Sequence, residues 1–479
     1  MKNRFIKLSS IILLVIALSG CEKWLDVNNS PDAISNEKIA LKGHLPALLA
    51  EWALMGSGDD VNASMFWTCQ RATWSYLPGW EAFTINATTG NDLWNNAYSG
   101  TLRNADVLYK RAKEENNPYY QGIAALIKAS QMACLVDNFG KVPYSEALRY
   151  PEIEKPKFDE GKDVYVEAMK LFDESIALLS STDPIAGPGD DDYVYSGDTE
   201  KWLKLAYSYK ARYSMRLTYA PGYTKNGQAQ KVLDALANGL SSSDDDALFR
   251  HGSGETQRGF FGWQQTQDYA QGIVANVVFV DYMKSKNDPR VPFFFTTVDF
   301  GEGSEYHGWK SGVATSDFPY HPSMANNVSD ETPETFMNYA ECLFLKAEAY
   351  VLLHNYPAAE SALKEAITVN MTEKGVAESD ITTYLSQITF PQSEEAAQQM
   401  VITEKWVASY LTTAEPRFDW IRTGYPVLDF TKAHLELANQ TTMPRRYLYP
   451  QDAVDRNPNT PSNNGIDEFA KGGVFWDAK

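Results

Sequence analysis

Aromatic side chains crowd one short stretch of the sequence, MFWTCQRATWSYLPGWEAF at residues 65–83. Flat aromatic rings stack on the apolar faces of sugar rings, and polar neighbours can bond the hydroxyls at the rim. One or more of these rings could instead pack against helices, because large aromatics are highly buried on average. We expect five residues of this stretch to contact a ligand: Trp67, Arg71, Trp74, Tyr76 and Trp80.

Two more tryptophans lie in loop-like sequence further along the chain. Trp263 stands in GFFGWQQTQDY and Trp309 in SEYHGWKSGV. The glycines and polar residues around each of them favour irregular backbone. Both are therefore candidate ligand contacts, with core packing as the same alternative.

No pattern typical of an enzyme accompanies these aromatics. The six histidines are scattered, and the sequence lacks HExxH, GxSxG, a P-loop and a GxGxxG between a strand and a helix. Acidic pairs are too numerous to single out the two carboxylates of a glycoside hydrolase. The sequence thus favours a protein that binds without catalysis, while a surface glycoside hydrolase and a pure assembly scaffold remain alternatives.

The acidic segment GDDDYVYSGD, at residues 189–198, is a candidate calcium site. It lacks the spaced pattern of calcium loops, so a solvated acidic loop is the preferred interpretation and no cofactor is expected. Cys69, Cys134 and Cys342 form no CxxC metal pair. The apolar settings of the last two predict buried free thiols, with one disulfide still open.

Cys21 points to chemistry of a different kind. It follows a basic start, an apolar run of eight residues at 11–18, and Leu-Ser-Gly. This layout is that of a secretory signal peptide, and its end resembles the lipobox of bacterial lipoproteins, in which Cys21 would become the acylated N-terminus. The alternative is a signal peptide whose cysteine merely follows the cut.

An apolar run of this length is too short to span a hydrocarbon core, which takes about 20 residues in a helix. We therefore expect residues 1–20 to be a removed leader and residues 21–44 to be a polar tether. Acyl chains on Cys21 would hold the protein at a membrane without crossing it.

The charge of the chain restricts its partners. Its formal net charge is −19 and its isoelectric point is about 4.8. Nucleic acid and anionic membrane surfaces need clustered Lys and Arg, so neither is an expected partner of the folded part. The 44% hydrophobic content of the 479 residues is enough for a large core.

Helical periodicity dominates the segments that must position the candidate residues. In TEKWLKLAYSYKARYSMRL, five apolar and aromatic residues recur on one helical face and are predicted to be core: Trp202, Ala206, Tyr209, Tyr213 and Leu217.

The clearest pair of helices is predicted at residues 336–370, FMNYAECLFLKAEAYVLLHNYPAAESALKEAITVN. Its alanines let two antiparallel helices approach closely, and Pro357 suits the first turn of the second. The spacing resembles a tetratricopeptide repeat, and residues 92–136 and 163–217 look like degenerate versions. We expect a mainly α fold with about four such pairs, mainly within 92–220 and 333–412.

The remaining segments are rich in Gly, Asp, Ser and aromatics, and they include residues 57–91, 184–198 and 241–335. Long irregular stretches in a compact domain are usually functional or disordered. We expect a single domain over residues 45–479, in which the helical repeats pack against an irregular loop-rich half with few short strands. These three segments would form its ligand side.

Several segments, in order along the chain, resemble one family. They are the lipobox with CEKWLDVNNSP, then VDNFGKVPYSEAL, DPRVPFFF, TPETFMNYAECLFLKAEAYV, ITEKWVASYLTTAEPRFDWIRTGYP and PRRYLYPQDAVDRNP. Together they are similar to the SusD/RagB outer-membrane lipoproteins of Bacteroidetes, and most of all to their shorter SusD-like branch.

The resemblance implies four tetratricopeptide-like helix pairs and a place at the outer membrane, on the cell surface. It also implies a role as the lid of a SusC-like TonB-dependent transporter, to which the protein hands over an oligosaccharide or a peptide. Cys21 matches the lipid-carrying cysteine of the family. The aromatic platform of the starch-binding members does not align with this chain, so the tryptophan assignments depend on the residues alone.

One matching family segment is interpreted as structural. It predicts a buried ion-pair network near the last helices, formed around Glu404, Trp406, Arg417, Asp419 and Arg422.

Overall fold

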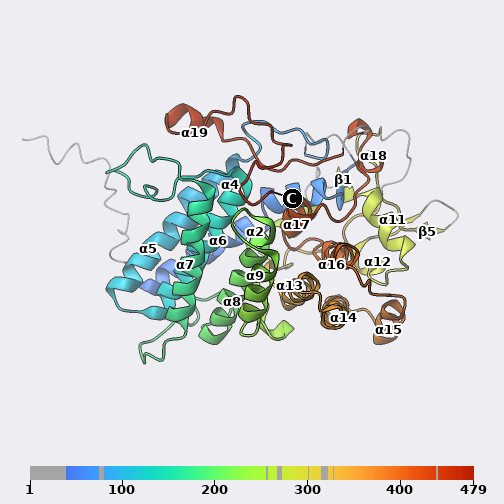
Figure 1. Ribbon diagram of the computed structural model, residues 1–479, viewed down its shortest axis with the longest axis horizontal. Coiled ribbons are helices and arrows are strands. Elements are labelled where there is room, and N and C mark those ends of the chain that lie inside the picture. Colours follow the sequence, from blue (N-terminus) through green and yellow to red (C-terminus); the bar gives the residue numbers. More distant parts are fainter. Residues whose placement is uncertain are drawn as a thin grey trace, which may run out of the picture.

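The computed structural model places most of the chain in helices that surround a large core (Figure 1). This confirms the predicted mainly α fold. The residues it describes are 39–74, 80–254, 257–266, 272–299, 301, 303–313, 322–326, 328–437 and 441–478, without the side chains of 55–57, 59, 265 and 266. Cys21 and Tyr76 lie outside the described residues.

The first half of the chain is a row of antiparallel helices. α5 (Leu102–Glu114) packs on α6 (Pro118–Phe139), α6 packs on α7 (Gly161–Leu179), and α7 packs on α8 (Thr199–Arg216). These helices lie side by side in Figure 1. They correspond to the two degenerate repeats predicted from the sequence.

The second group of helices follows the loop-rich middle of the chain. α13 (Tyr339–Leu352) packs against α14 (Tyr356–Glu373), and α16 (Glu394–Ala408) packs on both of them. α17 (Glu415–Thr423) follows α16 and reaches back to α3 (Asp59–Trp67) and α8. The two groups therefore form one body.

Capping residues mark the starts of several of these helices. Asn117 caps α6 and is followed by proline in its first turn, and Asp198 caps α8 by accepting from two backbone amides. Asn355 caps α14, with Pro357 in its first turn. Such caps satisfy amides that have no partner inside the helix.

The predicted core stripe of α8 is confirmed. Its five residues, from Trp202 to Leu217, are all buried. In the α13–α14 pair, Ala359, Ala362 and Ala366 are buried and pack on α13, as small residues at a close helix contact should.

Further helices lie around these two groups, some near the top of Figure 1 and some near its lower edge. α2 (Leu41–Ser57) begins within residues 21–44, which were predicted to be a tether. The last four residues of that predicted tether are therefore helical. Within the part of the chain that the structure describes, no helix is both long enough and apolar enough to cross a membrane. The further helices around the two groups are α2, α4 (Asn91–Asn95), α9 (Lys225–Leu236), α15 (Glu378–Ser386) and α19 (Gln451–Arg456).

The described part of the loop-rich half contains three small antiparallel sheets, which confirms the prediction of few short strands there. β1 (Arg71–Thr73) pairs with β3 (Ile273–Ala275), with Ala72 opposite Val274. The other sheets pair β2 (Ala247–Phe249) with β6 (Glu334–Met337) and β4 (Val298–Asp299) with β5 (Ser304–Glu305). Short helices fill the space between them, α10 (Phe260–Thr266), α11 (Val277–Ser285), α12 (Val291–Phe294) and α18 (Phe430–Ala433).

Candidate ligand-binding site

Four segments that are distant in the sequence meet at the β1–β3 pair. The amide of Trp309 donates to the carbonyl of Ala275 at 2.8 Å, next to β3. The amide of Thr73 donates to Oγ of Ser311 at 3.0 Å, and the amide of Ser311 donates to the carbonyl of Ala433 at 3.0 Å. Backbone bonds therefore fix the relative positions of the loops that carry two of the candidate tryptophans.

Trp74 and Trp309 come together at this junction. Their ring centroids lie 4.5 Å apart with the planes at 70°, an edge-to-face arrangement. Trp309 is buried, whereas Trp74 is half-buried and follows the last residue of β1. Trp309 thus supports the ring of Trp74, and Trp74 is the member of the pair with exposed surface.

Hydrogen bonds to described residues fix Trp80 and its neighbour Glu81. Oγ1 of Thr73, just before Trp74, donates to Oε1 of Glu81 at 2.7 Å. Burial raises the pKa of Glu81, while this bond opposes the shift. The carbonyl of Trp80 accepts from Nε1 of Trp67 at 3.0 Å, and the half-buried ring of Trp80 packs edge-on against Phe66.

His434 lies on the other side of Ser311. Its Nδ1 accepts from the amide of Glu436 at 3.0 Å, so the neutral ring carries its proton on Nε2. Burial lowers the pKa of His434, which favours that neutral form. A side chain at Gly312 would begin 3.0 Å from the imidazole, so glycine permits this close approach.

Two residues predicted to contact a ligand are structural. Trp67 is 0% exposed, and the guanidinium of Arg417 lies 4.6 Å from its ring centroid, so no face of the indole is open. Arg71 is 6% exposed, and its Nη1 donates to Oδ1 of Asn62 at 2.7 Å. Burial lowers the pKa of Arg71 to about 10. These two buried residues help to hold the candidate site in position from the interior of the protein.

Trp263 lies on α10, near β1. The neighbouring Phe261 ring lies 5.7 Å from the guanidinium carbon of Arg71, and Trp263 itself is half-buried and packs on Phe260. The described candidates with exposed surface are therefore Trp74, Trp80 and Trp263.

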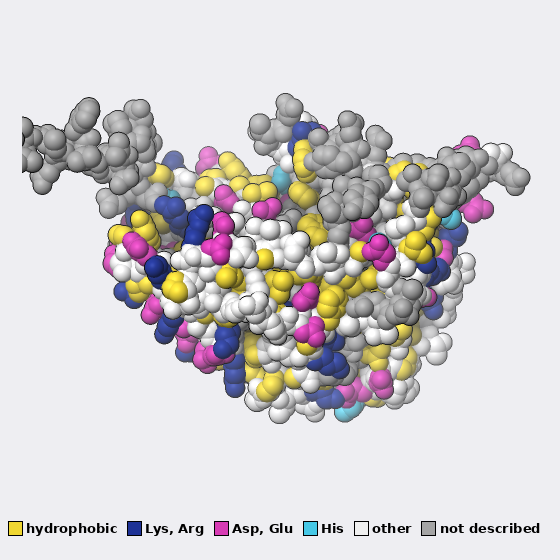
Figure 2. Space-filling model, turned by 90° about the horizontal axis from the view of Figure 1, so that it is seen from above, with side chains coloured by type: hydrophobic (Ala, Val, Ile, Leu, Met, Phe, Trp, Pro, Cys, Tyr) yellow, Lys and Arg dark blue, Asp and Glu magenta, His cyan; other side chains and the backbone are white. Residues whose placement is uncertain are grey.

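Figure 2 shows the molecule from above, with hydrophobic, basic and acidic side chains interspersed on this face. Apolar groups appear as separate patches.

The acidic segment at 189–198 uses its carboxylates for local structure. Oδ2 of Asp191 accepts from the hydroxyl of Tyr120 at 2.8 Å. Asp192 accepts from the amides of Val194, Tyr195 and Gly197 and from Nε1 of Trp202. No group of three or more His, Cys, Asp or Glu that could hold a metal ion occurs among the described residues.

The three cysteines among the described residues are free thiols. Cys69 and Cys342 are buried and Cys134 is half-buried. Burial raises the pKa of Cys342 to about 12, which keeps the thiol protonated and unreactive.

The predicted ion-pair network lies in the interior, beneath the loops. Arg417 pairs with Asp60 at 3.0 Å, and Arg422 pairs with Glu348 at 2.6 Å and with Asp419 at 2.9 Å. All five side chains are buried. This confirms the structural interpretation of the segment.

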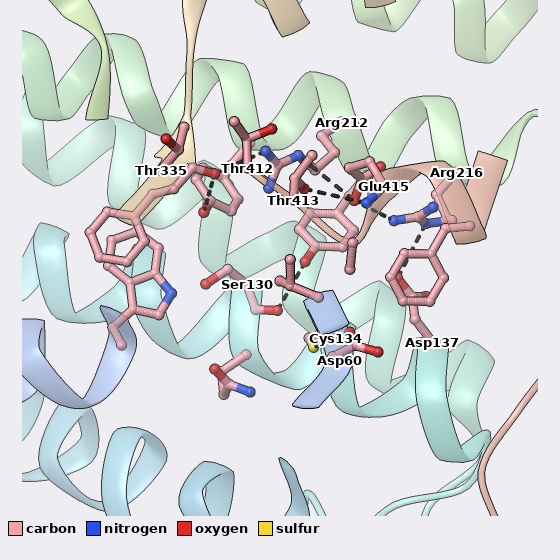
Figure 3. Close-up of a pocket in the computed structure, with 18 residues that line it drawn as sticks. Asp60, Ser130, Cys134, Asp137, Arg212, Arg216, Thr335, Thr412, Thr413 and Glu415 are labelled. Atoms are coloured by element: carbon pink, nitrogen blue, oxygen red, sulfur yellow. Dashed lines mark hydrogen bonds and ion pairs between the residues drawn. The ribbon is translucent and has the colours of Figure 1, made fainter. Parts of the chain in front are cut away.

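A polar cavity of about 80 Å³ opens within this network, between α3, α6, α8 and α17. Figure 3 shows Glu415 between Arg212 and Arg216, and Arg216 also pairs with Asp137 at 3.1 Å. Burial raises the pKa of Asp137 to about 6, although Arg216 opposes the shift. The charges here are paired with one another, so the cavity belongs to the core.

Sequence reasoning missed Glu81, Ser311 and His434, which hold the loops of the candidate site together. Ser311 lies two residues after Trp309 and Glu81 directly follows Trp80, so adjacency to the tryptophans was the available signal. Their partners lie far away in the sequence, and no spacing pattern reveals them.

Comparison with known proteins identifies the fold. A family profile named SusD-like, described as starch-binding and associating with the outer membrane, matches residues 58–450. A search of curated proteins found no match.

Solved structures of the same fold cover nearly the whole chain. A SusD homologue from Bacteroides uniformis is 22% identical, with 91% of this chain and 99% of that chain covered and a TM-score of 0.75. A SusD/RagB family protein from Bacteroides thetaiotaomicron is 24% identical, with coverages of 92% and 99% and a TM-score of 0.72.

A third structure is that of a chitin-binding protein, with 21% identity, coverages of 92% and 100% and a TM-score of 0.75. At these identities the three structures establish the fold, and the profile match over most of the chain establishes the family. The protein belongs to the SusD-like family, whose members are described as starch-binding and associated with the outer membrane.

Proposed function

We propose that this protein binds an oligosaccharide at the cell surface without cleaving it and delivers it to a SusC-like TonB-dependent transporter, for which it acts as a lid. The observation that carries the ligand part is the Trp74–Trp309 pair, in which a buried indole backs a half-exposed one. A rigidly supported ring offers a stacking face at low entropic cost.

The rest of the proposed site supplies polar groups and further rings. Trp80 and Trp263 are half-buried on neighbouring segments, and Tyr76 belongs to the sequence between Trp74 and Trp80. An amphipathic sugar ring needs both an aromatic face and hydrogen-bonding groups at its rim. This composition supports a glycan over a peptide as the ligand.

The sequence and the family support the proposed anchor and partner. Lipid on Cys21 would hold the protein on the outer membrane, and residues 21–40 would tether the folded body beside its transporter. The family's association with the outer membrane supports this arrangement. No cofactor is needed for such a role.

Binding isotherms with starch and chitin oligosaccharides test the ligand proposal, since the family is described as starch-binding and a protein of the same fold as chitin-binding. We expect Trp74→Ala to weaken binding by about tenfold or more, because a stacking contact is worth roughly 1 kcal/mol beyond its area. Tyr193→Ala is the matched control, an aromatic that is 52% exposed in the acidic segment.

Equal binding by the wild type and Trp74→Ala would overturn the site. Turnover of either oligosaccharide by the purified protein would instead favour the hydrolase alternative. Co-purification of a large outer-membrane barrel with the protein would support the partner, and its repeated absence from native membrane extracts would contradict it.

A further inference from the structure

A second hollow, away from the candidate site, lies among α11, α15 and α16. Its volume is about 530 Å³, within the range of about 300–1,000 Å³ that small-molecule sites occupy. The C-terminal end of α11 lines it with Tyr282, Ser285 and Lys286. The candidate site around Trp74 and Trp309 is the loop site. Neither the loop site nor the ion-pair network requires a hollow of this size.

The two sites lie at opposite ends of α11. The amide of Val277, at the N-terminal end, donates to the carbonyl of Trp309 at 3.0 Å. Ser285, at the other end, lines the hollow, and eight residues of helical rise separate the two positions by about 12 Å. The hollow is therefore a separate site.

The floor of the hollow carries charges that are already satisfied. Glu404 is 7% exposed, and its Oε1 accepts from the hydroxyl of Tyr384 at 2.8 Å while its Oε2 accepts from Arg290 at 3.1 Å. Arg290 is also paired with Asp288 at 2.6 Å. Neither ion therefore needs a charged ligand, and the half-buried Tyr282 offers more ring surface to the hollow than Tyr384, which is 5% exposed.

The walls combine apolar surface with neutral hydrogen-bonding groups. Ile388, Ala396 and Met400 are half-buried and supply the apolar part. Exposed amides and a hydroxyl stand at the rim, from Gln387, Gln399 and Thr389. An amide can donate and accept at once, so this set matches vicinal hydroxyl groups.

Charge argues against an ionic ligand. Among the described residues that line the hollow, Lys286 is the one cation, and its Nζ lies 5.8 Å from the ring centroid of Tyr282. The carboxylates of Glu404 and Asp288 beneath it oppose an anion, while Arg290 and Lys286 oppose a cation. A neutral ligand meets neither penalty.

We propose that this hollow is a second saccharide-binding site, which takes a neutral sugar of one or two rings. The tyrosine faces contact the apolar side of the sugar, and Gln387, Gln399 and Thr389 bond its hydroxyls. This site does not depend on the loop site, and its existence would stand if the proposed function of Trp74 failed.

Side-chain amide signals of the full chain, labelled with ¹⁵N-glutamine and solubilised in detergent, provide a local readout. The probes are maltose and N,N′-diacetylchitobiose, each added to about 10 mM, where a site of millimolar Kd is nearly filled. We expect at least one of them to shift the signals of Gln387 and Gln399 saturably. Glycylglycine and glucuronate serve as a peptide and an anionic sugar for comparison.

Variants separate this site from the loop site. Ala396→Trp, which fills the hollow, should abolish the shifts, and Gln399→Ala should weaken binding about three- to tenfold through loss of one hydrogen bond. Trp74→Ala should leave the shifts intact. Gln230→Ala is the matched control, because Gln230 is exposed on α9 and bonds Asp234 of the same helix.

The proposal is overturned if neither neutral disaccharide shifts the two glutamine signals, or if only glycylglycine or glucuronate does. It is also overturned if the response survives in a folded Ala396→Trp protein. If the Ala396→Trp protein does not fold, the affinities of Gln387→Ala and Gln399→Ala decide instead. Unchanged affinity in both of these variants would overturn the proposal.

Discussion

Arg417 holds the inner ends of several helices together through buried contacts. It is 0% exposed, its Nη1 bonds Asp60 at 3.0 Å and Asn138 at 2.6 Å, and it stacks on Trp67. We expect Arg417→Met to lower the free energy of unfolding by about 3–5 kcal/mol, because it leaves the carboxylate of Asp60 buried without its partner. Urea unfolding followed by tryptophan fluorescence measures the loss.

Arg456→Met is the matched control for Arg417. Arg456 lies on α19 with 81% of its side chain exposed, and its pair with Asp452 is a surface contact. Its replacement should leave the urea midpoint unchanged. A loss below 1 kcal/mol for Arg417→Met would mean that Asp60 is satisfied in another way.

Asp246 gives the protein a pH dependence of stability. Burial raises its pKa to about 7, and the nearby carboxylates of Glu373 and Asp245 add to the shift. A carboxyl that holds its proton more tightly in the folded state makes the protein less stable as the pH rises from about 4 to 7.

Asp246→Asn should remove this dependence, since an amide oxygen can still accept from the amide of Tyr339, as Oδ1 does now at 2.7 Å. After allowance for solvent screening of a partly exposed group, we expect the variant to gain about 1–2 kcal/mol relative to wild type between pH 5 and pH 8. Denaturation of the wild type and of Asp246→Asn at pH 5 and at pH 8 measures this gain. The exposed Asp234 on α9, changed to Asn, should show no such gain.

At the scale of elements, the α13–α14 pair depends on small residues. Ala366 is 0% exposed where α14 meets α13. We expect Ala366→Leu to destabilise the protein by about 1–3 kcal/mol, because the added carbons must push two packed helices apart. Thermal unfolding of both proteins measures this.

Ser361→Leu is the control on the same helix. Ser361 is exposed on the outer face of α14, so the same increase in size meets no neighbour there. An equal loss in both variants would show that helix propensity or solubility, rather than packing, causes the effect.

The helices could be predicted because their signals are local. The stripe from Trp202 to Leu217 and the proline in the first turn of α14 each follow from residues less than one helix length apart. Such periodicity reports directly on the buried face.

The loop site could be predicted only in composition. Trp67 and Trp74 occupy similar sequence, yet the first ends α3 in the core and the second follows a strand at the surface. The difference depends on Ala72 pairing with Val274, some two hundred residues away, and on Arg417 covering Trp67. Contacts between residues so far apart in the chain leave no periodic pattern in the sequence.

At the scale of the whole molecule, the helical repeats act as a rigid support for the loop-rich half. Arg212 of α8 bonds Glu341 of α13 through two contacts of 2.7 Å, and α17 joins both groups of helices through Glu415. The repeats thereby fix the ends of the segments that carry the tryptophans. Such stiffness would serve the proposed binding role, because a preformed site loses less entropy when it captures its ligand.

We propose that the position of this body in the cell depends on Cys21, which lies outside the described residues. We expect Cys21→Ser to abolish incorporation of radiolabelled fatty acid and to move the protein from the outer-membrane fraction to the soluble fraction, because a signal peptide alone leaves no lipid behind. Lys23→Ala, two residues away, should change neither. If Cys21→Ser remained in the membrane fraction, the transporter or another contact would be holding the protein. Extraction with high salt would then separate that protein contact from a lipid anchor, since acyl chains resist salt while charged interfaces weaken in it.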